Sequence, residues 1–535
     1  MTDRDKKYFL LLALFAGILL FCGLGVRELF SGDETRVAGI TAEMVLDRDF
    51  VVPRLNGRPF LEYPPLYYQA GSLFLRLFGF TDGAAKLPSA AAAFCAALLL
   101  YILARKLSLP PPSALAAGIL LLTSAQFFEN SRKCMVDAML FLFVLLAVFA
   151  FYAMTRSRGR RAQTGFFLLY AAGLAGGVMT KGLIGFAFPW AGLGVWLVLD
   201  DVFFEKRFTF RRYLLLALGA VPALIPVCIW GYLLYLCEGN AALRTVFVTN
   251  GIGRFSGSQG DHVESFWFYF RKLPVLFQPY LVLFLLAMVH AVLLLKRKRL
   301  PREMLLPFAC AAAPFAMLCV SSAKRQVYLL PVYAAWALMT VWYVFDRRQT
   351  VREAFSGLPQ AVRRGLLLCA GVAAAAVFFV FLFLSPGGTK LLPAAGLLLA
   401  AAALLGRRFR SALLILALAA GCVCIDTAVL ARKNRENSLR PLFEACRRAE
   451  RENCRITLQS PPERTSGAAV FYMKKTLPVA NAKTPVAPDE RRVARSRTPM
   501  PGLPFADDHY LLFSPGDEKN QNVPLKKQTK GTPRP

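Results

Sequence analysis

The sequence predicts a polytopic α-helical membrane protein with a small polar domain at its C-terminal end. Hydrophobic residues make up 56% of the 535 residues and the mean hydropathy is +0.46, whereas soluble domains contain about 45–50% apolar residues. The apolar residues gather into runs of roughly 17–22 residues, long enough to cross a hydrocarbon core of about 30 Å as a helix. A soluble amphipathic helix would carry a polar stripe, and these runs carry none.

Thirteen membrane spans follow from these runs. They are predicted at residues 8–26, 84–104, 112–128, 136–154, 164–180, 182–199, 213–237, 276–295, 304–321, 326–345, 364–384, 389–405 and 410–431. The first span resembles a signal peptide, but Arg27 and Glu28 stand where a small-residue cleavage site would follow. We therefore expect it to remain as an uncleaved helix.

The basic residues set the predicted orientation. The net charge of +31 comes from short bursts between the apolar runs, which is the pattern of cytoplasmic loops and not of a nucleic-acid-binding surface. With a cytoplasmic N-terminus, all the dense bursts between helices fall on the cytoplasmic side. These bursts are Arg105-Lys106, Arg156–Arg161, Lys206–Arg212, Lys296–Arg302, Arg347–Arg364 and Arg407–Arg410.

We divide the chain into a transmembrane domain over residues 1–431 and a C-terminal domain over residues 432–535. Two long loops, at residues 27–83 and 238–275, are predicted on the outer side. The C-terminal domain is basic, but segments longer than about 60 residues cross the membrane regardless of charge. An odd number of spans therefore places this domain outside as well.

The C-terminal domain is predicted to have a small α/β fold. Ser438–Glu452 has helical spacing, and Cys454–Gln459 and Ala468–Met473 have the composition of short strands. The polar stretch beyond about Lys519 is expected to be disordered. Cys446 and Cys454 could pair in an oxidising compartment, and two free thiols fit the sequence equally well.

The first outer loop is the most informative segment. Arg36–Asp47 has apolar residues at helical spacing and predicts an amphipathic helix in the membrane interface. The segment from Val51 to Tyr68 is dense in Pro, Gly and aromatic residues and predicts ordered turns. By position alone, Asp33 fits a carboxylate cap of this helix, and Glu62 fits a solvated loop residue.

Cations in the shorter outer turns run against the usual charge bias. They are Arg132, Lys133, Lys181, Lys324 and Arg325. Snorkelling to lipid headgroups would explain any one of them. Together they predict an anion-binding site at the outer leaflet, because ionisable groups at membrane depth are usually functional. The second long loop, which contains Arg254 and His262, has the composition of a lid or acceptor loop, and a plain linker would look similar.

Six motifs occur in a distinctive order. They are SGDETR after Arg27, LDRDFVVPRLNGRPFLEYPPL, SRKCMVDAML, MTKGLIGFAFP, NGIGRF and SSAKRQVYLLPVY. Together they resemble the bacterial aminoarabinose transferase family, within the wider protein O-mannosyltransferase-like group. The resemblance covers most of the chain. It implies a GT-C glycosyltransferase of the bacterial inner membrane, with the active site facing the periplasm, which moves a sugar from a polyprenyl-phosphate carrier to an acceptor.

The resemblance also implies roles for individual residues. Asp33 corresponds to a residue of the catalytic centre, and Asp137 is assigned to catalysis with it. The cavity counterparts are Arg36, Glu62, Asp137, His262 and Tyr328. We assign the remaining acceptor and cavity positions to Glu34, Tyr63 and Arg254.

The chemistry of the reaction agrees with these roles. The carrier phosphate must be neutralised as the glycosidic bond breaks, and Arg is suited to phosphate because it makes bidentate contacts. The candidates for the donor phosphate are Arg36, Lys181, Lys324 and Arg325, with Tyr328 beside them. A carboxylate could take the proton of a hydroxyl acceptor, whereas a phosphate acceptor needs no base. Glu62 and His262 leave a divalent metal open, and no other cofactor is expected.

One residue departs from the family pattern. Tyr63 stands where the aminoarabinose enzymes typically have Lys, so either Lys324 or Arg325 supplies that charge or the sugar or acceptor differs. The expected partners are a polyprenyl-phosphate-linked sugar, a lipid or protein acceptor and membrane lipids. Lipid A is the first candidate acceptor, and a protein or a polysaccharide is the alternative. A lipid-linked sugar flippase or a transporter is the alternative of another class, although the chain lacks a clear internal repeat and its charges lie at one rim.

Overall fold

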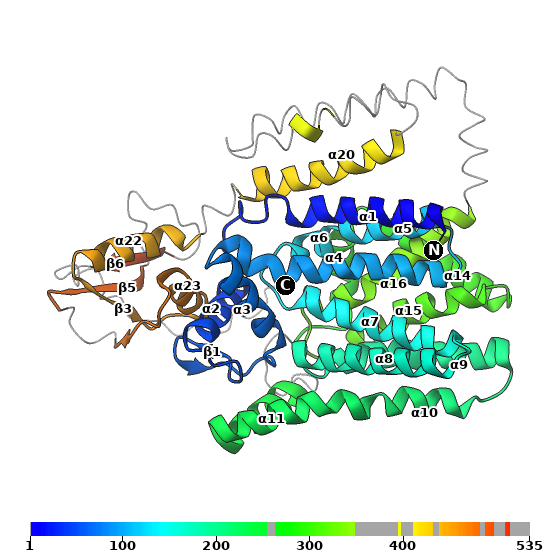
Figure 1. Ribbon diagram of the computed structural model, residues 1–535, viewed down its shortest axis with the longest axis horizontal. Helices are drawn as coiled ribbons and strands as arrows, with labels where there is room; N and C mark the ends of the chain where they lie inside the picture. The colour runs from blue at the N-terminus through cyan, green and yellow to red at the C-terminus, as the bar shows by residue number, and fades with distance from the viewer. Residues whose placement is uncertain are drawn as a thin grey trace, which may run out of the picture.

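The structure, a computed structural model, describes residues 2–253, 263–347, 394–396, 398, 410–431, 438–481, 487–496 and 509–513. Helices, most of them long and roughly parallel, form one part of it (Figure 1). These are α1 (Asp3–Phe21), α4 (Asp82–Lys106), α5 (Pro111–Thr123), α6 (Ala125–Ser131), α7 (Asp137–Arg156), α8 (Arg160–Lys181), α9 (Ile184–Asp200), α10 (Phe210–Leu218), α11 (Ala220–Leu243), α13 (Phe268–Leu276), α14 (Leu281–Lys296), α15 (Leu305–Val320), α16 (Tyr333–Asp346) and α20 (Arg410–Cys424).

Shorter 3₁₀ and π segments extend several of these helices. They are the π-helices η1 (Asp201–Glu205), η2 (Arg244–Gly253) and η6 (Ile425–Leu430) and the 3₁₀-helices η3 (Arg302–Met304) and η4 (Gln326–Val332). Seven described helical segments are long and apolar enough to cross a membrane, and α5 with α6 makes an eighth if this pair, bent by 72°, is one span. The chain is therefore a multi-pass helical membrane protein.

The predicted spans agree with the helices in position, with shifted boundaries. The first helix ends at Phe21 and not at residue 26, and α14 begins at Leu281 and not at residue 276. Span 364–384 lies outside the described residues, and so does most of span 389–405. The total of thirteen therefore stays a prediction.

Small residues let α8 and α9 approach closely. A Cβ on Gly185 would lie 2.1 Å from the carbonyl carbon of Gly177, so neither helix can carry a larger residue at this crossing. In contrast, α11 and α14 expose apolar side chains such as Val221 and Val282, which are 63% and 66% exposed. Apolar side chains at such density suit contact with lipid.

The first long loop folds into three elements. They are α2 (Gly32–Leu46), a hairpin of β1 (Arg54–Leu55) with β2 (Arg58–Pro59), and α3 (Leu66–Phe78). The prediction of turns up to Tyr68 is wrong at its end, because α3 begins directly after Pro65. Proline is compatible with a helix start, where its missing N–H is not needed.

The apolar face of α2 packs on protein, while its predicted place in the membrane interface stays a prediction. Most of its residues are buried, and α3 and α23 (Glu463–Met473) both pack on it. A Cβ on Gly39 would lie 2.4 Å from the Cα atom of Gly467 in α23, so the two helices touch backbone to backbone. The apolar residues of α2 therefore face protein and not lipid.

The C-terminal domain contains a four-stranded sheet beside α22 (Arg440–Arg451) and α23 (Figure 1). Its strands are β3 (Arg455–Gln459), β4 (Val479–Ala480), β5 (Glu490–Ser496) and β6 (His509–Phe513), in the order β4-β3-β5-β6. β3 is parallel to β4 and β5, and β6 is antiparallel to β5. The small α/β fold is confirmed.

Two details of this domain correct or refine the predictions. Ala468–Met473 belongs to a helix and not to a strand, because parallel β3 and β4 need a crossover between them. Cys446 is buried and Cys454 is half-buried, and neither forms a disulfide within the described ranges. The predicted disorder beyond Lys519 concerns residues outside the described ranges.

Candidate active site

Asp33 and Arg36 lie in the first two turns of α2. Ser31 caps this helix, because its hydroxyl accepts a hydrogen bond from the Glu34 amide at 3.2 Å. The prediction that Asp33 is the cap is therefore wrong. Residues three apart share a face of a helix, and Arg36 Nη2 donates to Asp33 Oδ1 at 2.7 Å. The carboxylate of Asp33 is thus left free to meet a side chain from another part of the chain.

Arg325, between α15 and η4, contacts the second oxygen of this carboxylate. Its Nη2 atom donates to Asp33 Oδ2 at 2.6 Å, and the Asp33 side chain stays 28% exposed. Burial by itself would raise the pKa of Asp33, but the charges of Arg325 and then Arg36 outweigh it and hold the pKa below 3.8. Asp33 is therefore ionised at neutral pH, with one guanidinium on each oxygen.

Arg36 connects this carboxylate to two further ones. Its guanidinium lies 3.4 Å from Glu62 in the first loop and 2.7 Å from Glu463 at the start of α23. Burial opposes its charged form, but Glu62 and Asp33 outweigh burial and raise the pKa of Arg36. A cation from α2 thus joins the first loop to the C-terminal domain.

A second ion pair lies where α8 ends and α7 begins. Lys181 Nζ contacts Asp137 Oδ1, and the two side chains are only 4% and 2% exposed. Within the described residues, Asp137 Oδ2 has no hydrogen-bond partner. The rings of Tyr63 and Tyr328 lie 5.6 Å and 4.9 Å from Lys181 Nζ, within the range of a cation–π interaction.

The two ion pairs form one group of side chains, because the charge of Lys181 also acts on Asp33 and helps to lower its pKa. We call this group the rim cluster. It consists of Asp33, Arg36, Glu62, Tyr63, Asp137, Lys181, Arg325 and Tyr328. Its members come from α2, the first loop, α7, α8 and the segment at η4. Three cations beside a half-exposed carboxylate can bind a phosphate and hold a base next to it.

A second group of charges lies deeper, and we call it the buried network. It consists of Arg27, Glu34, Lys86, Arg132 and Asp426, none more than 4% exposed. Arg132 donates to Asp426 at 2.8 Å and to the carbonyls of Leu19 and Cys22. Arg27 donates to the Arg132 carbonyl at 2.7 Å and lies 3.3 Å from Asp426.

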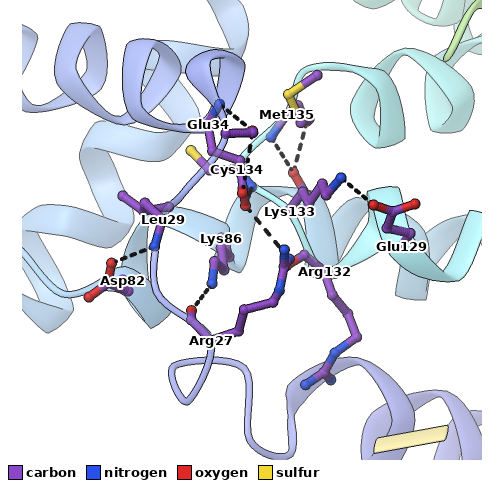
Figure 2. Close-up of polar contacts among 12 residues, drawn as sticks. Arg27, Leu29, Glu34, Asp82, Lys86, Glu129, Arg132, Lys133, Cys134 and Met135 are labelled. Carbon is purple, nitrogen blue, oxygen red and sulfur yellow. Dashed lines mark hydrogen bonds and ion pairs between the residues drawn. The ribbon is translucent and has the colours of Figure 1, made fainter. Parts of the chain in front are cut away.

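Glu34 and Lys86 complete this network (Figure 2). The Glu34 carboxylate accepts from the Cys134 amide at 3.3 Å and lies 3.6 Å from Arg27. Lys86 donates to the Arg27 carbonyl. The network thereby fixes the end of α1 and the start of α2 to α4, to the turn before α7 and to η6. It sets the direction in which Asp33 leaves the helix.

Several predicted site residues lie apart from the rim cluster. Glu34 points into the buried network, and Lys324 is buried and donates to the carbonyls of Ser321 and Glu264. The outer-turn cation Lys133 pairs with Glu129 on α6. Arg254 and His262 lie outside the described residues.

No group of three or more His, Cys, Asp or Glu side chains suited to a metal ion occurs in the described part of the chain. Glu62, the other predicted ligand, contacts Arg36. A divalent metal at Glu62 and His262 therefore stays a prediction.

Sequence reasoning missed Glu463, Arg27 and Asp426. Glu463 is 427 positions from its partner Arg36, and it lies in a segment whose neighbouring residues read as a strand. Arg27 adjoins a predicted span and the first motif, and nothing in its local sequence indicates a buried partner. Asp426, a carboxylate inside the last predicted span, carried a signal that could have been used, because a charge within a span usually pairs with another.

Comparison with known proteins supports the same class. The family model described as dolichyl-phosphate-mannose-protein mannosyltransferase matches residues 56–236. The undecaprenyl phosphate-alpha-4-amino-4-deoxy-L-arabinose arabinosyl transferase 2 of Proteus mirabilis is 28% identical over 350 residues, which cover 65% of this chain and 61% of the relative. The corresponding transferase of Erwinia tasmaniensis is 26% identical over 79% of this chain and 72% of its own length.

The fold is also found in solved structures. ArnT from Cupriavidus metallidurans bound to undecaprenyl phosphate aligns with a TM-score of 0.67 at 20% identity, over 89% of this chain and 86% of that chain. Its apo structure aligns with a TM-score of 0.65 at 21% identity. These matches confirm the resemblance predicted from the sequence, to the ArnT-like and protein mannosyltransferase-like group of GT-C glycosyltransferases. The chain spans about three fifths of the length of several of the curated relatives it matches.

Proposed function

We propose that the chain is a membrane glycosyltransferase that moves a sugar from a polyprenyl-phosphate donor to an acceptor at the face of the rim cluster. The observation that carries this proposal is the carboxylate of Asp33 held between Arg36 and Arg325, beside the ion pair of Lys181 and Asp137. This arrangement combines phosphate-binding cations with an ionised carboxylate. The relatives support the same chemistry, because their names describe transferases of a sugar from undecaprenyl phosphate.

The cations would bind the donor phosphate. Arg325 is 25% exposed and Arg36 is 11% exposed, so Arg325 is the more accessible of the two guanidiniums. A phosphate that enters the cluster would take over part of the contacts that Asp33 now makes to Arg325. Charge that develops on the phosphate as the glycosidic bond breaks would then be neutralised in a partly dehydrated site, where such contacts are strong.

Loss of an arginine contact would leave the Asp33 carboxylate free to face the acceptor. For a hydroxyl acceptor, Asp33 would accept the proton as the oxygen attacks the sugar, an effect of about 10²–10⁴-fold. For a phosphate acceptor, the attacking oxygen is already ionised and Asp33 would orient the donor. Asp137 would hold Lys181 in the cluster, and its Oδ2 atom, which has no partner in the described part of the chain, leaves it one more hydrogen bond to make.

Tyr63 bears on the choice of substrate. The aminoarabinose enzymes typically have Lys at this position, and here the phenol ring lies against Lys181. Burial raises the pKa of the Tyr63 hydroxyl well above its usual value, so this residue stays neutral. Tyr63 therefore supplies no positive charge to the cluster, and Arg325, not the buried Lys324, is the candidate to replace it. We propose lipid A or lipopolysaccharide as the first acceptor to test, with a protein hydroxyl or a polysaccharide as the alternative.

The proposal includes a topology. Thirteen spans with a cytoplasmic N-terminus would place the rim cluster and the C-terminal domain on the periplasmic side of the bacterial inner membrane. The described basic bursts support this orientation, because Arg105-Lys106 and Arg156–Arg161 lie at the ends of α4, α7 and α8 that are opposite the rim cluster. A cysteine introduced next to the rim cluster should then react with a membrane-impermeant maleimide in intact cells.

The test of the function is mass spectrometry of lipid A and envelope glycoconjugates from a deletion strain and the same strain carrying the wild-type gene. A sugar mass that is lost on deletion and restored by the gene identifies the acceptor class. Loss of a sugar from a glycoconjugate whose lipid-linked precursor accumulates on the inner side would instead show a flippase. Identical sugar profiles in both strains, with the gene expressed, would contradict any role in sugar transfer.

A further inference from the structure

A cavity of about 240 Å³ lies at the end of the helices remote from the rim cluster. The helix α7 begins at Asp137 in the rim cluster and ends at Arg156 beside this cavity. At 1.5 Å per residue, its two ends are about 30 Å apart, the thickness of a hydrocarbon core. The cavity is therefore a separate site at the opposite end of the helices. Its lining residues come from the ends of α7 and α9, from η1, from the start of α10 and from η3.

Arginines dominate the walls of the cavity. They are Arg156, Arg207, Arg212 and Arg302. Two of them are fixed by the fully buried carboxylate of Asp200, which accepts from Arg212 at 2.5 Å and from Arg302 at 2.7 Å. Asp201 also pairs with Arg212, and Glu205 pairs with Arg302. The four arginines outnumber these three carboxylates, so the cavity keeps a positive charge.

Buried polar groups at the cavity lack a partner. Trp196 is 1% exposed and lines the cavity, and its indole N–H has no acceptor within the described residues. The same holds for Arg212 Nε and for the hydroxyl of Thr209. An indole N–H and a guanidinium N–H can only donate, and an unpaired buried donor is costly. The missing partner is therefore rich in acceptor oxygens.

Phosphate meets this description. It offers several acceptor oxygens, carries negative charge and suits arginine better than a neutral ligand does. The rim of the cavity adds an apolar surface, because Val202, Phe208 and Phe210 beside it are 63%, 70% and 63% exposed. A headgroup in the cavity would thus place its acyl chains against exposed apolar side chains.

We propose that this cavity binds a phosphate group, presented by an anionic phospholipid or free in solution. The exposed apolar residues favour the lipid. Positively charged pockets between helices on the basic side of a membrane protein are suited to such headgroups. This site is independent of the rim cluster and of the proposed glycosyl transfer, since it lies at the other end of the same helices.

The test measures binding by the full-length purified chain. Phosphatidylglycerol is titrated into detergent-solubilised protein, and the bound lipid is counted by native mass spectrometry. Arg156→Gln is the charge variant, because Arg156 has no carboxylate partner among the ion pairs of the described residues. Arg161→Gln is the matched control, since Arg161 is exposed on the same face and does not line the cavity. Thr209→Val and Trp196→Phe remove a hydroxyl and an N–H without changing the charge.

The expected result is about fivefold weaker phosphatidylglycerol binding for Arg156→Gln, with Arg161→Gln unchanged. Thr209→Val and Trp196→Phe should weaken binding as well. Equal losses for Arg156→Gln and Arg161→Gln would show a diffuse charge effect and overturn the proposal. If all of the cavity variants bind phosphatidylglycerol with wild-type affinity, the proposal is also overturned, and the cavity holds only water.

A second arm separates the two sources of phosphate. Inorganic phosphate is titrated against the wild-type chain in phosphatidylcholine nanodiscs, with tryptophan fluorescence as the signal. A saturable change that is absent in Trp196→Phe supports free phosphate as a ligand. Phosphatidylglycerol binding without that change supports the lipid. A wild-type chain that responds to neither probe overturns the proposal, whatever the variants do.

Discussion

The rim cluster and the buried network are built from the same residue types but differ in exposure. Each holds a carboxylate between two arginines: Asp33 between Arg36 and Arg325, and Asp426 between Arg27 and Arg132. Asp426 is 4% exposed and its arginines are nearly fully enclosed, whereas Asp33 is 28% exposed and Arg325 is 25% exposed. An enclosed ion pair can only hold the fold, and an open one can exchange its partner for a ligand. Exposure, and not composition, therefore separates the structural role from the proposed catalytic one.

The largest effect is expected in the buried network. Asp426→Asn should lower the stability of the chain by about 3–5 kcal/mol, because two buried guanidiniums lose their shared carboxylate. Thermal unfolding of the detergent-solubilised protein, followed by size-exclusion chromatography, measures the change. Asp3→Asn is the control, since Asp3 is an exposed partner of Lys6. An unfolding temperature for Asp426→Asn equal to that of the control would contradict the role assigned to the network.

Asp33→Asn should have the opposite profile. For a hydroxyl acceptor, we expect sugar transfer to fall by about 10²–10⁴-fold, with an unfolding temperature close to that of the wild type because the site is partly solvated. Turnover with a polyprenyl-phosphate sugar in proteoliposomes measures the loss. Asp47→Asn, on the exposed end of the same helix, should retain full turnover. If Asp33→Asn is as active as Asp47→Asn, the assignment of Asp33 is wrong.

Arg325→Gln should change the pH dependence of the reaction. The pKa of Asp33 is held below 3.8, so its charged form and its ion pairs are present above that pH and are lost only as the pH falls through the lowered pKa. The wild-type rate should therefore show no loss from Asp33 between pH 8 and pH 5. Removing Arg325 removes the largest charge that lowers this pKa, so the acid limb should move to higher pH and the affinity for the donor should fall about tenfold. If the rate of Arg325→Gln falls at the same acidic pH as the wild-type rate, Arg325 does not control the protonation of Asp33.

The smallest effect is expected at the contact between the rim cluster and the C-terminal domain. Glu463 is 57% exposed, so its ion pair with Arg36 is screened by solvent. Glu463→Gln should lower turnover by less than about fivefold, which corresponds to at most about 1 kcal/mol. Glu450→Gln, which removes an ion pair with Lys475 elsewhere in the same domain, is the comparison. A loss above tenfold in Glu463→Gln alone would show that Arg36 depends on the C-terminal domain for its position.

Much of the fold could be predicted from the sequence, because long apolar runs have few alternatives in a membrane. The helices α4, α7 and α8 lie close to spans 84–104, 136–154 and 164–180. The helix α23 could not be predicted, because its apolar residues fit a strand by composition and only the pairing of β3 with β4 requires a crossover. Its packing on α2 depends on the approach of Gly39 and Gly467, which no local pattern reveals.

The site was predicted in part. Asp33, Arg36, Lys181 and Arg325 were found from the resemblance and from the cations in outer turns, and the structure brings them together. Glu34, the neighbour of Asp33 in sequence, was assigned to the acceptor and cavity positions. Neighbouring residues on a helix point about 100° apart, however, and Glu34 therefore enters the buried network. Contacts across the whole chain, such as Arg36 with Glu463, require the tertiary structure.

The crossing of α2 with α23 sets an order of events during biosynthesis. The helix α2 is made among the first fifty residues, but the surface that covers its Gly39 face and the Glu463 carboxylate that meets Arg36 come only with α23, more than four hundred residues later. A nascent chain can thus insert every earlier helix and still leave the Gly39 face of α2 uncovered. Completion of the site is then a late step in the life of the chain, and a ribosome that stops before α23 releases a protein with its membrane helices in place and its site open on one side.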